Sequence, residues 1–474
     1  MAFFDRSKEK AFLDQLVNSE KQEVFILYGR RRVGKTALLN EITRNKRGVY
    51  FTGRQVTAEE LLRSFSASVS QLLNTEGLVF ATWEAALEKV FELGKTQSVF
   101  LVIDEFQYMV EVVPSLPSIL QHFIDQNIDG KLNLLLCGSS ISFMEGILSY
   151  RNPLFGRKTG YINLKAISFE ESKEFLPKLD YHSLLEAYSI TGGIPLYLLL
   201  WNERKNTRNN ITELFLSIGS PLKEEPVFIL MQELREPRVY HSILQAIAAG
   251  RKTPADISSR IGTGDSRMLQ PYLNTLRSLG IVQRVTNALE RNPARTRKVI
   301  YEISDPLFRF WFTFIFPYLD AIERQQLEVL QRKLSVDFEQ YVSFEFEFLA
   351  RKKVSQLFSL DSVGRYWKKD IEIDILGIKD SEIIVGEVKW RNKKMTLSDL
   401  RKLQEKCGSA RIEPSRYILV SKSGFDESLL ASSSRNSLFL LSFDKQRGWI
   451  EEKQFEATAE TTTRENSDAP KSRS

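Results

Sequence analysis

The clearest chemical signal is a phosphate-binding loop near the amino terminus. The pattern Gly-x-x-x-x-Gly-Lys-Thr follows a strand-like run, VFILY at 24–28, and leads into a helical stretch, Thr36–Thr43. Glycines let backbone N–H groups curl around phosphate oxygens, and the start of the next helix adds its dipole. The lysine of such a loop reaches the β- and γ-phosphates, and the hydroxyl that follows holds Mg²⁺. We therefore predict that ATP and Mg²⁺ bind at Gly29, Arg30, Arg31, Arg32, Val33, Gly34, Lys35, Thr36 and Ala37.

Two carboxylates stand where this chemistry needs a magnesium ligand and a base. The apolar run VFLVI at 99–103 ends in Asp104 and Glu105. Ligands of parallel α/β sheets bind at the carboxyl ends of the strands. We expect Asp104 to hold Mg²⁺, directly or through water, and Glu105 to polarise the attacking water.

Two further residues are candidates for the same reaction. The run LNLLLC at 132–137 ends in Gly138, Ser139 and Ser140. Ser139 is placed to contact the γ-phosphate or the water, although a turn with exposed serines suits the same residues. Arg157 is a candidate for stabilising the transferred phosphoryl group, from the same chain or across a subunit contact. An ordinary surface arginine is the alternative.

A second group of acids lies in the C-terminal part of the chain. Apolar and polar residues alternate over 371–376, as they do in a half-buried strand. A second predicted strand, EIIVGEVKW, contains Glu387 and Lys389. Two antiparallel strands joined by GIKDS at 377–381 would bring Asp374, Glu387 and Lys389 to one edge. Carboxylates there suit Mg²⁺, and the lysine suits the charge formed when water attacks a phosphodiester. A helix at 341–352 would add Glu347 to this group. The alternative is a solvent-exposed strand with cross-strand ion pairs, which explains the same pattern without a catalytic role.

The elements around these residues predict an α/β protein. Short runs rich in Val, Ile, Leu and Phe alternate with helical stretches up to about residue 205, as in a parallel sheet covered on both faces. Five such runs are predicted to be strands: VFILY (24–28), GVYF (48–51), VFLVI (99–103), LNLLLC (132–137) and YINL (161–164). A second α/β pattern begins near residue 331. The predicted divisions are 1–205 (P-loop ATPase core and lid), 206–237 (helical linker), 238–303 (winged helix-turn-helix), 304–330 (aromatic connector and helix), 331–452 (second α/β domain) and 453–474 (disordered tail).

Positive charge is concentrated in one segment. Residues 238–298 hold eleven Lys and Arg against three acids, while the rest of the chain holds 55 against 57. Three helical patterns and a hairpin predict a winged helix-turn-helix there, with residues 266–279 as the recognition helix. Such a segment suits DNA, or else is an exposed basic surface or a packing module. The candidate DNA contacts are Arg267 and Arg277 on the helix and Arg295, Arg297 and Lys298 in the wing.

Composition narrows the class of protein. The chain has 474 residues, 42% of them hydrophobic and 27% charged, so we expect about three globular domains. Two cysteines and three histidines argue against a disulfide scaffold and a zinc enzyme. No apolar stretch is long enough for a membrane span, and the charged N-terminus does not resemble an export signal, so we expect a cytoplasmic protein without membrane contact.

The first part of the chain resembles the archaeal-type ATPase family, a branch of P-loop ATPases close to the AAA+ and STAND groups. The resemblance covers nearly all of residues 1–205 and rests on FFDRSKE (3–9), YGRRRVGKTALL (28–39), LVIDEFQYM (101–109), LLLCGSS (134–140), NPLFGR (152–157) and TGGIPLYL (191–198). It implies that the region of Arg6 and Glu9 caps the nucleotide pocket. It also implies that Gly193-Ile194-Pro195 closes against the nucleotide from a lid, which makes Pro195 a nucleotide-binding candidate.

The C-terminal order of elements is similar to the PD-(D/E)xK nuclease fold, which the same family often carries. The entry signature of that domain resembles DPLFRFWF (305–312) and YVSFEFE (341–347), with Ser343 where glycine is usual, so the start of the helix is expected to differ. The resemblance implies an ATPase that acts on DNA or is regulated by it. The alternative is a nucleotide-gated DNA-binding or signalling scaffold with an inactive nuclease fold. Assembly into a homo-oligomer is left open by the sequence.

Overall fold

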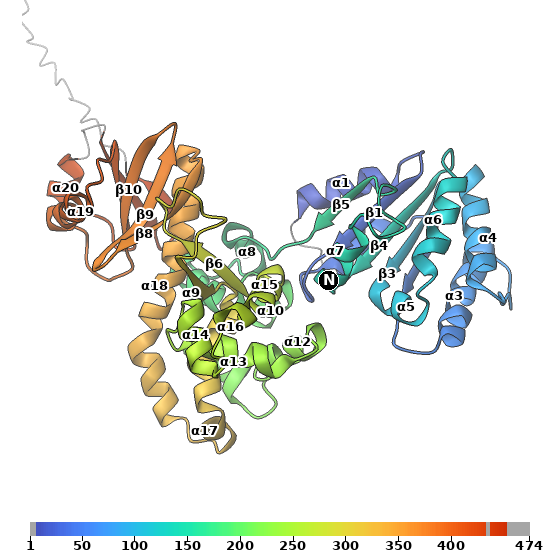
Figure 1. Cartoon of the computed structure of the whole chain (residues 1–474), viewed down its shortest axis with the longest axis horizontal. Helices are drawn as coiled ribbons and strands as arrows, with labels where there is room; N and C mark the ends of the chain where they lie inside the picture. The colour runs from blue at the N-terminus through green and yellow to red at the C-terminus, as the bar shows by residue number, and fades with distance from the viewer. Residues whose placement is uncertain (1–5, 433–436, 453–474) are drawn as a thin grey trace, which may run out of the picture. The chain divides into compact units, whose positions relative to one another are not determined.

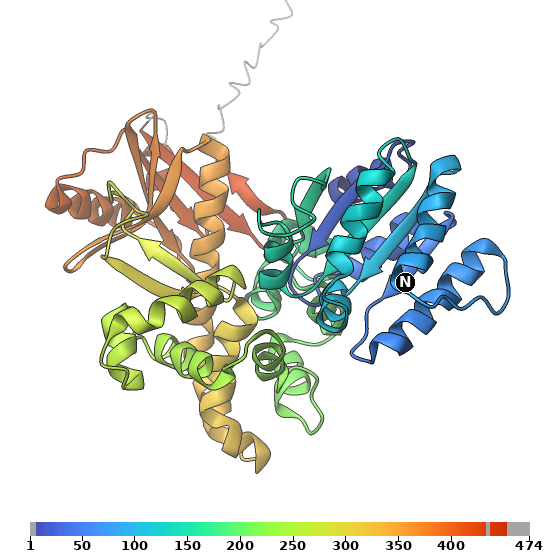
Figure 2. The ribbon, with the colours of Figure 1, turned by 45° about the vertical axis from the view of Figure 1, so that its right-hand side comes forward.

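The computed structural model describes residues 6–432 and 437–452 (Figures 1 and 2). These residues fall into two compact units, which divide between Phe346 and Glu347. Each unit is described by itself. The predicted disordered tail and residues 3–5 of the FFDRSKE motif lie outside the described residues. None of the described helices is both long and apolar enough to cross a membrane.

The first unit begins with the predicted parallel sheet. Its five strands lie in the order β2-β3-β4-β1-β5, and every neighbouring pair is parallel. All five apolar runs predicted as strands are confirmed within one or two residues. The strands are β1 (Glu23–Tyr28), β2 (Gly48–Thr52), β3 (Val99–Asp104), β4 (Leu132–Gly138) and β5 (Gly160–Asn163).

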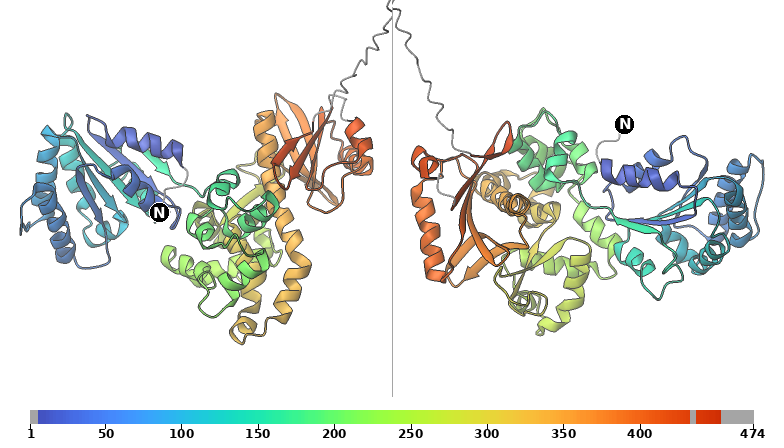
Figure 3. Two further views of the ribbon diagram at one scale, coloured as in Figure 1. Left: turned by 180° about the vertical axis from the view of Figure 1, so that it is seen from behind. Right: turned by 90° about the horizontal axis from the view of Figure 1, so that it is seen from above.

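Helices lie on both sides of this sheet (Figure 3). Every residue of the central strands β3 and β4 is buried, which explains why these strands are continuous apolar runs. Because parallel strands need crossover connections, helices link each strand to the next. The linking helices are α2 (Lys35–Thr43), α3 (Ala58–Leu73), α4 (Trp83–Thr96), α5 (Phe106–Val112), α6 (Leu116–Gln126) and α7 (Ile141–Ile147), and α1 (Ser7–Val17) precedes the first strand.

A helical region follows the sheet and packs around an aromatic core. Phe308, Phe310, Trp311 and Phe314 are fully buried, and the Trp311 indole donates a hydrogen bond to the carbonyl of Lys223 at 2.6 Å. The helices of this region are α8 (Phe169–Phe175), α9 (Tyr181–Thr191), α10 (Pro195–Leu200), α11 (Thr207–Ile211), η1 (Thr212–Leu216), α12 (Glu225–Glu233), α16 (Pro306–Phe310), η3 (Trp311–Ile315), η4 (Phe316–Tyr318) and α17 (Leu319–Glu323).

The basic segment has three helical pieces followed by an antiparallel pair of strands. The helix predicted over 266–279 is in fact a 3₁₀ turn, η2 (Ser266–Leu269), followed by an α-helix, α15 (Gln270–Ser278). Pro271 explains the break, because proline has no N–H and is favoured in the first turn of an α-helix. The other elements are α13 (Pro237–Ala248), α14 (Pro254–Ile261), β6 (Val282–Thr286) and β7 (Val299–Ile303).

The second unit is a mixed sheet in the order β13-β12-β11-β10-β9-β8. The central pairs β10–β11 and β11–β12 are parallel, and the outer pairs are antiparallel. Its elements are the end of α18 (Glu328–Phe358), β8 (Ser362–Lys368), β9 (Ile371–Lys379), β10 (Glu382–Lys389), α19 (Leu397–Ala410), β11 (Arg416–Ser421), α20 (Glu427–Ser432), β12 (Leu438–Asp444) and β13 (Gly448–Glu451).

Two local predictions for this region were wrong. Strands β9 and β10 are joined by a two-residue turn, Asp380-Ser381, rather than by the five residues 377–381. Both turn residues have positive φ, 47° and 73°, as a tight hairpin with right-handed twist requires. The helix expected at 341–352 is part of the much longer α18, so Ser343 lies inside a helix and does not affect where it begins.

Candidate nucleotide site

The loop between β1 and α2 adopts a conformation that depends on its glycines. Gly29 and Gly34 have φ of 153° and 96°, and Arg32 between them has φ of 67°. A Cβ atom on Gly29 would lie 2.3 Å from the carbonyl oxygen of Leu164. The loop therefore packs directly against the chain that leaves β5, and only glycine fits at its first position.

Lys35 lies inside this loop. Its Nζ donates hydrogen bonds to the carbonyl oxygens of Gly29 at 2.7 Å and Arg30 at 3.1 Å. Burial lowers the pKa of the ammonium, which is opposed by the nearby charges of Glu105 and Asp104. The loop thus surrounds a buried cation at the start of a helix, which is an arrangement suited to phosphate.

Asp104 connects the loop to the sheet. Its Oδ2 accepts hydrogen bonds from the Thr36 hydroxyl and from the Tyr50 hydroxyl, both at 2.8 Å, and its Oδ1 accepts one from the Glu105 N–H at 2.9 Å. The residue is only 2% exposed. Burial and the charge of Asp104 raise the pKa of Tyr50, so the phenol stays a donor. Hydroxyl and carboxylate oxygens side by side are the ligands that Mg²⁺ prefers, and Mg²⁺ takes its remaining ligands from phosphates and water.

Glu105 is held at the edge of the sheet by two neighbours. It has φ of 51°, in the left-handed region that residues other than glycine seldom adopt. Its Oε2 accepts hydrogen bonds from the Ser139 hydroxyl at 2.7 Å and from the Gln107 amide at 2.5 Å. Ser139 is buried, so the alternative of a turn that exposes this serine is wrong.

The segments named by the family resemblance also reach the loop. Arg6 is buried and donates to the carbonyl oxygens of Val33 at 2.8 Å and Lys165 at 2.6 Å. Pro195 lies next to the loop, since its Cγ is 3.9 Å from the position of a Cβ on Gly34. Gly193 has φ of 69°, and a Cβ there would lie 2.1 Å from the carbonyl oxygen of Ile167. The loop is thus covered by residues from two distant parts of the chain.

The side chains of the three loop arginines bind protein groups, which differs from the predicted nucleotide contacts. Arg30 forms an ion pair with Asp305, Arg31 donates a hydrogen bond to the Tyr108 hydroxyl oxygen, and Arg32 Nη1 lies 2.5 Å from Glu225 Oε2. Their backbone N–H groups suit phosphate whatever the side chains bind.

Arg157 lies away from the loop of its own chain. Strand β5 is parallel to β1, with Gly160 opposite Phe25 at the end of the sheet remote from the loop. Arg157 precedes Gly160, and its guanidinium pairs with Asp125 at 3.0 Å. The structure therefore gives no support to a role within one chain, because β5 separates this arginine from the carboxyl edge of the sheet.

The predicted acids of the second unit lie near one another, with a second lysine that the sequence did not reveal. Glu387 binds Lys389 at 2.6 Å and Lys406, from α19, at 2.8 Å, while Asp374 Oδ2 accepts the Val388 N–H at 2.9 Å. Burial raises the pKa of Asp374 to about 6 and that of Glu347 to about 7, and a neighbouring carboxylate adds to both shifts. Glu347 also lies 3.9 Å from Arg351.

A metal held by Glu347, Asp374 and Glu387 together does not fit these residues. Among the described residues, no group of three or more His, Cys, Asp or Glu side chains is arranged to hold a metal ion. Two lysines already neutralise Glu387. We therefore derive no chemistry from a metal at this place.

The candidate DNA contacts are all exposed. Arg267 lies on the 3₁₀ turn and pairs with Asp265 at 2.9 Å, whereas Arg277 on α15 bonds Asn274 at 3.2 Å. The wing loop is shaped by Arg284, whose guanidinium donates to the carbonyl of Thr296 at 2.8 Å. The wing cations Arg295, Arg297 and Lys298 lie on this loop and are exposed.

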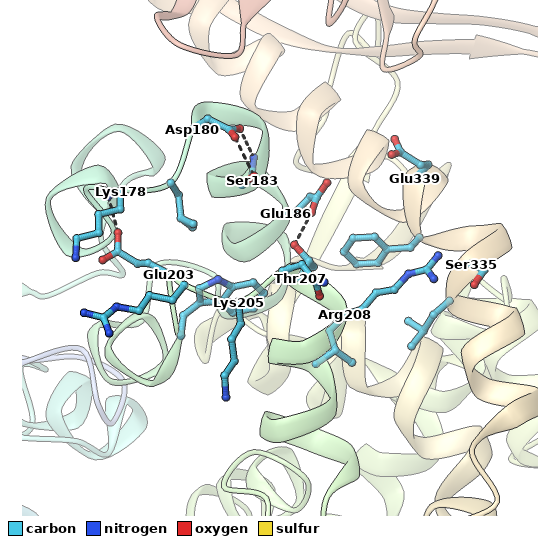
Figure 4. Close-up of a pocket in the computed structure, with 17 residues that line it drawn as sticks. Lys178, Asp180, Ser183, Glu186, Glu203, Lys205, Thr207, Arg208, Ser335 and Glu339 are labelled. Carbon is cyan, nitrogen blue, oxygen red and sulfur yellow. Dashed lines mark hydrogen bonds between the residues drawn. The ribbon is translucent and has the colours of Figure 1, made fainter.

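A separate cavity of about 580 Å³ lies beside α9 and α11 (Figure 4). It is lined by acids and bases, among them Glu186, Arg208 and Glu339, and Glu186 accepts a hydrogen bond from Thr207. It contains none of the residues of the nucleotide loop, nor Asp104 or Glu105. It is not the predicted site.

Similarity to known proteins identifies the family of this chain. Residues 3–200 match the family described as an ATPase domain predominantly from Archaea. Over 403 residues the chain is 32% identical to the uncharacterized protein MJECL04 of Methanocaldococcus jannaschii, covering 83% of this chain and 88% of the relative. The chain belongs to this archaeal ATPase family. The resemblance noticed in the sequence is thereby confirmed for the ATPase part.

Other similarities are shorter or more distant. Residues 311–402 match "Archaea bacterial proteins of unknown function". The uncharacterized ATP-binding protein MJ0074 of M. jannaschii is 48% identical over 46 residues, which are 10% of this chain and 13% of the relative. The Walker-type ATPase PABY2304 of Pyrococcus abyssi aligns with 65% of this chain and 96% of its own length, at 20% identity and a TM-score of 0.49.

The contact between Gly29 and Leu164 generates a prediction. Gly29→Ala would place a methyl group 2.3 Å from the Leu164 carbonyl oxygen, so the loop must move and nucleotide binding should fall at least about tenfold. Isothermal titration with ATP and Mg²⁺ measures the loss. Gly146→Ala is the matched control, because a Cβ there meets nothing within 4 Å, and it should bind as the unmodified protein does.

Proposed function

We propose that this protein binds ATP with Mg²⁺ at the β1–α2 loop and hydrolyses it. One observation carries the proposal: Asp104 joins Thr36 at 2.8 Å while Glu105 is oriented by Ser139 and Gln107. These contacts supply a magnesium ligand pair and a fixed carboxylate next to a phosphate-binding loop. Membership of an ATPase-domain family agrees with it, and so does the ATP-binding name of a relative that matches over 46 residues.

In this proposal each residue has one task. Lys35 and the loop N–H groups bind the β- and γ-phosphates, and Thr36 and Asp104 hold Mg²⁺, which neutralises phosphate charge. Tyr50 fixes the orientation of the Asp104 carboxylate by its hydrogen bond at 2.8 Å. Glu105 accepts a proton from the water that attacks the γ-phosphorus, while the bond from that phosphorus to the bridging oxygen breaks and ADP leaves. The hydrogen bonds from Ser139 and Gln107 hold the Glu105 carboxylate in position. Pro195 and Arg6 close the loop from outside.

Removing the proposed base should separate binding from hydrolysis. Glu105→Gln keeps an acceptor for Ser139 but cannot take a proton, so kcat should fall at least about 100-fold while the Kd for ATP changes less than about threefold. Phosphate release and calorimetry measure the two quantities. Glu111→Gln, an exposed acid on α5, is the control and should retain full activity. Equal hydrolysis by Glu105→Gln would contradict the assignment.

The basic segment 238–303 is proposed to be a winged helix-turn-helix that contacts DNA. Support comes from the order of its helices and hairpin and from its excess of eleven cations over three acids. Cations on the wing suit phosphates, so binding is expected to depend on charge more than on sequence. ATP turnover would then regulate this contact, or be regulated by it.

The wing proposal is tested with a triple variant, Arg295→Ala, Arg297→Ala and Lys298→Ala. Loss of three phosphate contacts should weaken duplex binding about tenfold or more near 0.1 M salt and reduce the slope of log K against log salt by up to about three. Fluorescence anisotropy at several salt concentrations measures both. Arg44, Arg63 and Lys89 changed to alanine are a control of equal charge on the exposed surface of the ATPase sheet region. An equal loss in both triples would refute a specific role for the wing.

For the second unit, residues 331–452 were predicted as a nuclease-like domain, and we propose that this fold binds nucleic acid without cutting it. The additional ion pair of Glu387 with Lys406, a lysine outside the predicted nuclease site, favours the scaffold over the nuclease. If Arg157 acts in ATP hydrolysis, we propose that it acts on the nucleotide loop of another copy of the chain, because it lies at the far edge of its own sheet.

Absence of cleavage is the expected result for the unmodified chain. Single-stranded, duplex and branched DNA should remain intact with Mg²⁺ or Mn²⁺, with or without ATP, over hours. A Lys406→Ala variant, which frees one side of Glu387, should bind DNA less tightly, by about threefold or more, since one cation is lost. Cleavage that disappears in Asp374→Ala would overturn the scaffold and establish a nuclease.

A further inference from the structure

Three acids from the helical region face the three arginines of the nucleotide loop. Glu225 and Glu233 lie at the two ends of α12, and Asp305 follows β7. We call these three residues the acidic clasp. Glu225 pairs with Arg32 and Asp305 pairs with Arg30, whereas Glu233 is close enough to Arg31, Lys35 and Arg30 for their charges to act on it. All three acids lie far from the loop in the sequence.

Glu225 joins the loop to the lid. It is 3% exposed, and its Oε2 lies 2.5 Å from Arg32 Nη1. Its Oε1 accepts the Tyr197 hydroxyl at 2.7 Å, and Tyr197 is on α10, which begins with Pro195. A carboxylate so deeply buried requires its cation, because an unpaired buried charge is strongly destabilising.

Asp305 joins the loop to the hairpin. Its Oδ2 pairs with Arg30, while its Oδ1 accepts the N–H of Phe308 at 2.9 Å and caps α16. The Arg30 guanidinium also lies 5.3 Å from the centre of the Phe308 ring. Both sides of this ion pair are thus fixed by packing and are well shielded from solvent.

Glu233 has no comparable partner. Its Oε2 is buried, and the described residues give it no hydrogen bond. Arg31, Lys35 and Arg30 lie close enough to act on its charge, and so does Glu105, which repels it. Burial raises the pKa of this carboxyl group. A buried carboxyl oxygen without a hydrogen bond therefore lies within electrostatic reach of the same cations that a phosphate would use.

We propose that Glu225, Glu233 and Asp305 determine the affinity of the loop for nucleotide, by competing with phosphate for the positive charge of Arg30, Arg31, Arg32 and Lys35. The inference rests on the proposed binding of ATP at this loop. Because a triphosphate carries more negative charge than a diphosphate, the clasp opposes ATP more than ADP. Binding of ATP then weakens the contacts of the loop with α12 and with the residue after β7.

The test removes one charge at a time while it keeps the shape of each side chain. Glu225→Gln and Asp305→Asn retain the oxygens that accept from Tyr197 and from Phe308 N–H, and Glu233→Gln loses no hydrogen bond of Oε2. The full chain is titrated in a calorimeter with ADP and with the non-hydrolysable analogue ADPNP, each with Mg²⁺. Each variant should bind ADPNP about three- to tenfold more tightly, and the gain for ADP should be smaller.

The control is Glu224→Gln, which neutralises the neighbouring exposed acid that lies 3.8 Å from Lys223. It should leave both affinities unchanged. Thermal unfolding without nucleotide checks that each variant is folded, and Glu233→Gln carries the test if the other two unfold. Unchanged or weaker ADPNP binding, or an equal gain for ADPNP and ADP, would overturn the inference. Failure of the unmodified chain to bind either nucleotide would instead refute the proposed function.

Discussion

Burial of positive charge in the nucleotide loop is the constraint on which the first unit depends. Arg30, Arg31, Arg32 and Lys35 lie within six residues, and Arg30 and Lys35 are largely removed from water. Cations in such a place must meet carboxylates, carbonyls or phosphates. The contacts of the loop follow this requirement: Lys35 bonds two loop carbonyls, and Arg30 and Arg32 bind acids of the helical region.

The sheet order supplies the other half of the site. Strand β3 lies between β2 and β4, so Tyr50 from one neighbour reaches Asp104 and Ser139 from the other reaches Glu105. Each carboxylate is then oriented by a hydroxyl that belongs to an adjacent strand. Because parallel strands end at the same edge of the sheet, the two carboxylates that we propose as magnesium ligand and base are held beside the loop.

Local chemistry could be predicted from the sequence, and long-range contacts could not. The loop, the five apolar strands and the position of Asp104 and Glu105 follow from spacing and from runs of apolar residues, because both are set by neighbours in the chain. Tyr50, Gln107 and Lys406 were missed, since their roles depend on which strand or helix packs beside another. Arg157 was predicted to belong to the site because of its sequence motif, but the direction of β5 puts it at the edge of the sheet opposite the nucleotide loop. The grouping of Asp374, Glu387 and Lys389 could be predicted from the sequence. Lys406, which also binds Glu387 and argues against a metal there, comes from a helix and could not be predicted.

Hydrogen–deuterium exchange of the α12 amides, with and without nucleotide, tests the competition between acids and phosphate most directly. The account predicts that saturating ADPNP with Mg²⁺ speeds exchange in Glu225–Glu233, because phosphate takes the cations that hold this helix, and that ADP speeds it less. Exchange that is unchanged or slowed by ADPNP, measured on protein that demonstrably binds the analogue, would contradict it.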